Sequence, residues 1–379
     1  MNRFLVLLAT LLTVPLVAHG SAVAQSVGSQ AHRPNGHAQD AATSQQDVDY
    51  TQHFRIFTSD GEPTSMQDIT RAMAHVDAVL VGETHTDPVG HWIQVELLRQ
   101  ALVTTRVEEQ SAAFRPVALS LEMFERDVQG IVDEYLEDLI TEDQFRISAR
   151  PWEYYDADYR PMVELAKQAG IPVIAANAPR RYVNRVTRLG RDALNDLPPR
   201  AHSSLPPLPY PQPSAAYREE WLALMAEMPM ERQCEVPATE VEEVGHAAVN
   251  PPEMKRPAHP PVESPAAEAP SHMAAFMENG LQAQTLWDAT MAYAITTFLT
   301  LNPGGLVLHM VGGFHVENHT GIPEQLEHYR PGTRSLVISM EMADDFRSFD
   351  PAEHAGLGDF VILTDKSLDL DYARNCAGQ

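Results

Sequence analysis

The feature that most constrains the fold is a repeating order of short apolar runs and helical patterns. Each apolar run is followed by a break and then by apolar residues at helical spacing. The predicted strands are Ala78–Val81, Val117–Met123, Pro172–Ala176, Leu306–Val311, Ser335–Met340 and Asp359–Leu363. The predicted helices are His91–Leu102, Val128–Leu139, Pro161–Gln168, Arg181–Leu189, Leu281–Leu299 and Ile322–His328. Because alternating strands and helices form largely parallel sheets covered by helices, the sequence predicts an α/β domain with a mainly parallel sheet flanked by helices.

The N-terminal segment, residues 1–24, is predicted to be a cleaved secretory signal peptide. A positively charged start precedes an apolar run at Phe4–Ala18, and Ala22–Ala24 matches a small-residue cleavage pattern. The alternative is a membrane anchor, but the run is shorter than the ~20 apolar residues that span a bilayer, and it contains a proline. With no cysteine at the cleavage site for a lipid anchor, we expect a periplasmic protein that does not span the membrane.

Two polar or proline-rich stretches flank and interrupt the domain. Residues 25–49 have hardly any large apolar side chains and are predicted to be a disordered linker. The domain itself is expected over residues 50–379. Prolines crowd at about 197–272, and because proline lacks a backbone donor, we expect a flexible insert there. A domain boundary is the alternative.

The charge balance limits the partners that the chain can bind. There are 27 Lys and Arg against 52 Asp and Glu, a formal charge of −25, which disfavours nucleic acid but leaves room for a local basic pocket. Two cysteines, Cys234 and Cys376, could form a disulfide in an oxidising compartment or remain free thiols. Their spacing matches no standard metal pattern.

Polar side chains gather where the predicted strands end, at the edge where ligands bind in parallel sheets. Glu83 and His85 follow the first strand, Glu122 ends the second, and His315 follows the fourth. Imidazole and carboxylate together bind transition metals, so Glu83, His85 and His315 are candidate ligands of a divalent metal. A glutamate beside them, such as Glu122, can act as a general base toward metal-bound water. All four are therefore candidate catalytic residues of a metal-dependent hydrolase.

The same residues also have structural interpretations. A buried Glu122 needs a partner, which could be Arg180, Arg181 or a histidine. His309 lies within a predicted strand and is more typical of a core histidine. Asp288 lies among apolar residues and is predicted to be a buried structural carboxylate, with the alternative that it reaches the site.

An aromatic segment, Trp152–Pro161, is the last candidate element. Aromatic residues at this density usually pack a loop against the domain, but they could form the wall of a flat apolar ligand site. Tyrosine phenolate is a known type of haem ligand.

Five motifs occur in the order seen in the ChaN family of haem-binding uptake proteins, in the Tiki superfamily. They are Val81–His85, Leu121–Phe124, Ala176–Arg180, Gln284–Ala292 and Gly312–His315. The chain resembles that family over about residues 54–363 apart from the insert. The resemblance implies a Tiki/ChaN/erythromycin-esterase-like fold and a periplasmic protein of haem or iron uptake that serves an outer-membrane or periplasmic system. It also implies haem bound through a tyrosine, with two haems face to face across a homodimer.

The resemblance bears on single residues too. Tyr155 or Tyr159 would bind the haem iron, and Arg180 or Arg181 would meet a propionate, since guanidinium suits a carboxylate. The wider superfamily uses a Gly-x-x-His motif with a glutamate, matched here by Gly82 and His85. Some of its members are metal-dependent hydrolases. The chain departs from many ChaN-like proteins in lacking a lipidation cysteine, and the haem tyrosine matches no single position. The hypotheses are a haem-binding protein, a metal-dependent hydrolase and a non-catalytic binding module.

Overall fold

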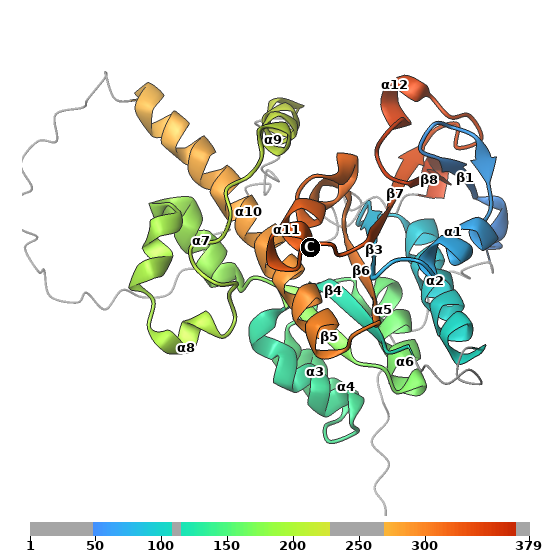
Figure 1. The fold of residues 1–379 in the computed structure, drawn as a ribbon, viewed down its shortest axis with the longest axis horizontal. Coiled ribbons are helices and arrows are strands. Elements are labelled where there is room, and N and C mark those ends of the chain that lie inside the picture. The colour runs from blue at the N-terminus through green and yellow to red at the C-terminus, as the bar shows by residue number, and fades with distance from the viewer. Residues whose placement is uncertain (1–47, 108–114, 228–268, 369–379) are drawn as a thin grey trace, which may run out of the picture. The chain divides into compact units, whose positions relative to one another are not determined.

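Eight strands form one sheet in the order β2-β1-β8-β7-β3-β6-β4-β5 (Figure 1). This computed structural model describes residues 48–107, 115–227 and 269–368. The strands are β1 (Phe54–Thr58), β2 (Pro63–Thr64), β3 (Ala78–Glu83), β4 (Val117–Glu125), β5 (Val173–Asn177), β6 (Leu306–Gly312), β7 (Ser335–Ala343) and β8 (Phe360–Asp365). From β8 to β5 neighbouring strands are parallel, whereas β1 pairs antiparallel with β8 and β2. The predicted, mainly parallel α/β sheet is confirmed, and β1 and β2 are additions to it.

Helices cover both faces of this sheet. One face carries α1 (Met66–Met73), α2 (Pro88–Val107), α3 (Gln129–Leu136), α4 (Glu142–Ala149), α5 (Tyr155–Asp158) and α6 (Arg160–Ala169), whose apolar side chains form the larger core. The other face carries α10 (Ala269–Leu301) and α11 (Ile322–Tyr329), and α7 (Arg180–Leu189) packs beside α10. A short α12 (Pro351–His354) precedes β8. Because two helical layers enclose the sheet, the β3, β4 and β6 strands are buried throughout except at Glu125, and their carboxyl ends point toward one edge.

The first part of the predicted flexible insert is packed, which corrects that prediction for residues 197–227. It contains α8 (Pro199–His202) and α9 (Ala215–Glu227). Tyr210, Tyr217 and Trp221 are each at most 5% exposed, because their rings pack against α10. Aromatic burial therefore outweighs the loss of backbone donors at the prolines. The next part of the predicted insert, residues 228–268, lies outside the described residues.

The long helix α10 satisfies its threonine hydroxyls within the helix. Five threonine hydroxyls donate to backbone carbonyls four residues earlier on the same helix, at 2.6–2.9 Å: Thr285, Thr290, Thr296, Thr297 and Thr300. Such bonds satisfy the hydroxyl locally. The helix can therefore lie between α7 and the sheet although it is rich in threonine.

Several predictions concern residues outside the described part of the chain. The signal peptide, nearly all of the linker, Cys234 and Cys376 are among them. Within the described residues, no helix combines the length and the apolar character needed to cross a bilayer.

Candidate functional site

The predicted site residues meet at the carboxyl edge of three neighbouring strands. Glu83 is the last residue of β3, Glu122 lies in β4, and His315 ends a 3-10 turn that follows β6. The sheet order places β6 between β3 and β4, so these three side chains and His85 converge. Their contacts form two histidine–carboxylate pairs.

The first pair joins His85 to Glu83. The Nδ1 atom of His85 lies 2.8 Å from Oε1 of Glu83, which also accepts the hydroxyl of Tyr159 at 2.8 Å. The side-chain amide of Gln94 donates to the other carboxylate oxygen. Glu83 is 4% exposed, whereas the His85 side chain is 42% exposed. The pair therefore has a fixed, buried carboxylate and a histidine that faces outward.

A second histidine, His91 in α2, lies behind Glu83. Its Nε2 is 3.7 Å from Glu83 and its Nδ1 is 3.2 Å from Asp158. Burial disfavours the imidazolium, but the negative charges of Glu83 and Asp158 prevail and raise the pKa of His91 to about 10. Burial likewise opposes the Glu83 charge, yet His91 and His85 hold the pKa of Glu83 well below its usual range. Sequence analysis missed His91 and Gln94, although their spacing of three residues places both on one helix face after the strand.

The second pair joins His315 to Asp288 of α10. The His315 Nδ1 atom lies 2.5 Å from Asp288, and its Nε2 lies 3.2 Å from the Gln284 amide and 3.8 Å from Glu122. Burial opposes the imidazolium charge, but Asp288 and then Glu122 raise the pKa of His315 to about 9. The alternative that Asp288 reaches the site is thus confirmed. It also has a structural role, because it is fully buried.

Glu122 lies next to the second pair, where His315 is the histidine among its predicted partners. Its Oε2 accepts the backbone N–H of Gly312 at 2.9 Å, and its other oxygen faces His315. A side chain at position 312 would also meet His85, since a Cβ there would lie 3.2 Å from its Nε2. The suggested partner Arg181 instead pairs with Asp127 at 2.5 Å. Glycine at 312 therefore allows both Glu122 and His85 to approach the β6 end.

A pocket opens beside this cluster. It is lined by Glu122, Met123, Glu125, Arg150, Trp152, Asn177, Ala178, Arg180 and Trp287. The Trp152 ring stands edge-on to His85, with centroids 5.0 Å apart, and Trp287 is similarly edge-on to His315 at 6.3 Å. Arg180 is exposed at the start of α7, and Arg150 pairs with Glu125 and Asp127. The pocket thus combines two indole rings with two guanidinium groups.

The two candidate haem tyrosines face inward in this structure. Tyr155 is 1% exposed and lies among Phe124 and Phe145, and Tyr159 is 2% exposed and donates to Glu83. Burial raises the pKa of both phenols, and the Glu83 charge adds to the effect at Tyr159. Both tyrosines therefore pack the aromatic segment against the domain, which is one of the two interpretations given for it. Neither hydroxyl lines the pocket.

Comparison with known proteins assigns the family. Residues 69–326 match the model of a family described as haem-binding uptake, Tiki superfamily, ChaN. The chain belongs to the ChaN family. The fold is similar to a solved structure of ChaN from Campylobacter jejuni, titled for cofacial haem binding, with 13% identity and a TM-score of 0.55 over 83% of this chain and 97% of that one. An erythromycin esterase mutant, EreC in its open conformation, matches at 10% identity and a TM-score of 0.35 over 82% of this chain and 83% of the other. Among curated proteins, none matches the sequence.

The predicted metal ligands do not form a metal site in this ChaN-family chain. Across residues 48–107, 115–227 and 269–368, no group of three or more histidine, cysteine, aspartate or glutamate side chains could hold a metal ion. The reason is local. Glu83 is surrounded by donors, and His315 is turned toward Asp288 and Gln284. Glu83, His85 and His315 therefore act as members of two pairs.

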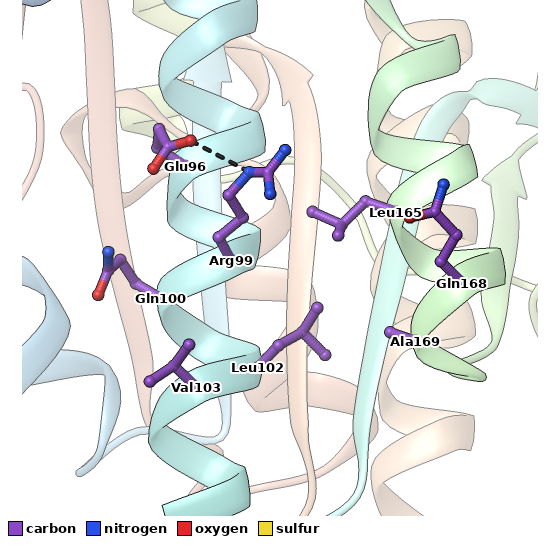
Figure 2. Close-up of a pocket in the computed structure, with 8 residues that line it drawn as sticks. All are labelled: Glu96, Arg99, Gln100, Leu102, Val103, Leu165, Gln168 and Ala169. Carbon is purple, nitrogen blue, oxygen red and sulfur yellow. Dashed lines mark ion pairs between the residues drawn. The ribbon is translucent and has the colours of Figure 1, made fainter.

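A second hollow lies between α2 and α6, away from the predicted residues (Figure 2). Its walls include Leu102, Val103 and Leu165, with an ion pair of 3.1 Å between Arg99 and Glu96 above them. Because α2 starts near the carboxyl edge and runs back along the sheet, this hollow lies toward the opposite edge. Its lining contains no histidine or cysteine.

Proposed function

We propose that this protein binds haem at the pocket beside Glu122 and serves haem or iron uptake in the periplasm. The observation that carries the proposal is the lining of that pocket in a chain of the ChaN family. Trp152 and Trp287 offer flat apolar surfaces, and Arg180 offers a guanidinium group for a carboxylate, whereas Arg150 is already paired with Glu125 and Asp127. Haem presents the matching chemistry, a flat apolar ring with two propionates. Export through residues 1–24 would place the protein where it could pass haem to an uptake system, and cell fractionation tests this.

The haem iron needs an axial ligand, and tyrosine remains the proposed one. Tyr155 and Tyr159 lie behind the pocket wall in this structure, so either could reach the iron only if the Trp152–Pro161 segment turned outward. A phenolate ligand at the iron would give a high-spin ferric haem. Haem binding should then change the fluorescence of Trp152, and Tyr155→Phe or Tyr159→Phe should weaken the Soret band. If neither substitution alters the spectrum, the ligand is another residue.

Titration of the protein with haemin tests the pocket itself. Arg180→Ala removes a charged group at the rim, and one charge-assisted hydrogen bond to a propionate is worth about 1.5–3 kcal/mol, so the dissociation constant should rise by roughly tenfold or more. Arg188→Ala is the matched control, because Arg188 is exposed on the same helix and does not line the pocket. Absence of a Soret band in the wild type would reject haem binding. Sedimentation with and without haemin tests the proposed homodimer.

A second candidate function is hydrolysis by acid–base chemistry, favoured by the two histidine–carboxylate pairs around Glu122. In such pairs the carboxylate orients the imidazole, so that one histidine can accept a proton from water while the other protonates a leaving group. We expect slow hydrolysis of a flat ester such as naphthyl acetate, lost in His85→Asn and His315→Asn and retained in His319→Asn, which changes an exposed histidine. Because the pKa of His315 is raised to about 9, a rate that depends on this residue as base should increase toward about pH 9. Equal rates in the wild type and the three variants would reject hydrolysis at this site and favour a non-catalytic binding module.

A further inference from the structure

We propose that Tyr217, in the segment between β5 and α10, is a positioning residue that fixes His315 in the candidate site. The inference deepens the proposed function, because it gives the segment containing α9 a role in ligand binding. It also makes a structural claim about His315 that stands without any ligand.

Helix α9 joins the helix that carries Asp288 to the loop that carries His315. On the α10 side, Arg218 pairs with Glu278 at 2.6 Å, and the Trp221 ring lies against Gly280, where a Cβ would come within 3.0 Å of it. On the loop side, the Thr320 hydroxyl donates to Glu220 at 2.7 Å. Residues 215–227 therefore bridge the two elements that meet at the Asp288–His315 pair.

Tyr217 points from this bridge toward the pair. It is 1% exposed, and its ring packs on Phe314, the neighbour of His315, with centroids 5.1 Å apart. Its hydroxyl faces both Asp288 and Gln284; burial, followed by the charge of Asp288, raises the pKa of Tyr217 well above its ordinary value. Asp288 and Gln284 are the two residues that contact the two ring nitrogens of His315. Tyr217 therefore lies beside the two residues that hold the imidazole of His315.

The hydrogen-bond needs of the group favour this role. The Oδ2 atom of Asp288 and the hydroxyl of Tyr217 are both buried, and neither makes a hydrogen bond among the described residues in this structure. A fully buried carboxylate requires donors on both oxygens, and its first oxygen is already engaged by His315. The Tyr217 hydroxyl is the donor available to the second oxygen. Without it, the carboxylate could rotate toward another donor, and His315 would lose its fixed direction.

The test compares two buried tyrosines of the same segment. Tyr217→Phe removes only the proposed contact and keeps the ring on Phe314. Tyr210→Phe is the matched control, because the Tyr210 hydroxyl donates to the backbone carbonyl of Gln282 on α10 at 2.8 Å and does not touch the pair. Proton NMR of the full chain should show a far-downfield resonance from the His315–Asp288 hydrogen bond, assigned by its loss in Asp288→Asn. We expect it to shift or vanish in Tyr217→Phe and to stay unchanged in Tyr210→Phe.

An unchanged resonance in Tyr217→Phe, or an equal change in both variants, overturns the proposal. Gln284→Leu provides a second variant, since Gln284 is only partly buried and its loss should disturb the same resonance. Haemin titration adds a functional result. Loss of one hydrogen bond should weaken binding about threefold to tenfold in Tyr217→Phe, with Tyr210→Phe close to wild type. If wild-type protein binds no haemin, the proposed function fails, while the NMR comparison still decides the role of Tyr217.

Discussion

Alkaline pH should destabilise this protein through His91, a histidine buried between two carboxylates. The pKa of His91 is about 10 in the folded protein, against about 6.5 for an exposed histidine. A group whose pKa is raised by folding stabilises the folded state fully below its unfolded pKa and loses that effect as the pH rises through the folded pKa. The relevant window therefore runs from about pH 6.5 to about pH 10.

The size of the effect follows from the same shift. At about 1.4 kcal/mol per unit of pKa, the change corresponds to roughly 5 kcal/mol across the window. Both carboxylates share this interaction, so the figure belongs to the group of His91, Glu83 and Asp158 together. It is a large part of the ~5–15 kcal/mol that stabilises an ordinary domain.

Urea unfolding at about pH 6 and about pH 10 measures the effect. The free energy of unfolding of the wild type should fall steeply between the two pH values. His91→Gln should be less stable at the lower pH and should lose less stability over the window, in which His315 still contributes because its pKa is raised to about 9. His75→Gln serves as control, because His75 is exposed after α1 and its variant should follow the wild type. If the wild type and His91→Gln lose equal stability over the window, the argument that Glu83 and Asp158 hold a buried imidazolium is refuted.

Three further predictions concern stability. Burial lowers the pKa of His309 to about 3. The stability contributed by neutral His309 is therefore fully present above about pH 6.5 and is lost as the pH falls toward 3. In acid unfolding, the stability of His309→Leu should depend less on pH than that of the wild type. Gly82→Ala should lower the free energy of unfolding by about 1–3 kcal/mol in thermal unfolding, because the new Cβ would lie 3.0 Å from the backbone of Gly313. Gly130→Ala is the control: its Cβ would have no atom within 4 Å, so the change should raise the free energy of unfolding by up to about 1 kcal/mol. Trp221→Ala should cost about 3–5 kcal/mol and expose α9 to proteolysis, and resistance equal to wild type would contradict the packing of α9.

The sheet could be predicted because its buried strands are continuous apolar runs. Val117–Met123 and Leu306–Val311 were identified almost to their ends. β1 was missed as a strand, since a five-residue strand with an exposed Arg55 has no such run. Helix α10 begins at Ala269 rather than at the predicted Leu281. The first turns were missed because prolines precede them in the sequence, whereas in the structure this part of the helix packs against α9.

The candidate site was predicted in part. Placement of polar residues after strands located Glu83, His85, Glu122 and His315, because parallel strands bring their carboxyl ends together. The sequence could not predict which carboxylate pairs with each histidine. The pairing of His315 with Asp288, for example, depends on how α10 packs across the sheet. For the aromatic segment the sequence favoured packing against the domain, and the burial of Tyr155 and Tyr159 agrees with that interpretation.

The threonines of α10 have one more consequence. Their hydroxyls are satisfied within the helix, and between Asn279 and Leu301 the sequence contains a single charged residue, Asp288. Advancing the helix by one residue would turn Asp288 by about 100° around the axis, away from His315 and into apolar surroundings. The aliphatic and threonine positions would tolerate such a slip far better. The Asp288–His315 pair therefore helps to set the rotation of this 33-residue helix on the sheet, and with it the position of Trp287 at the pocket.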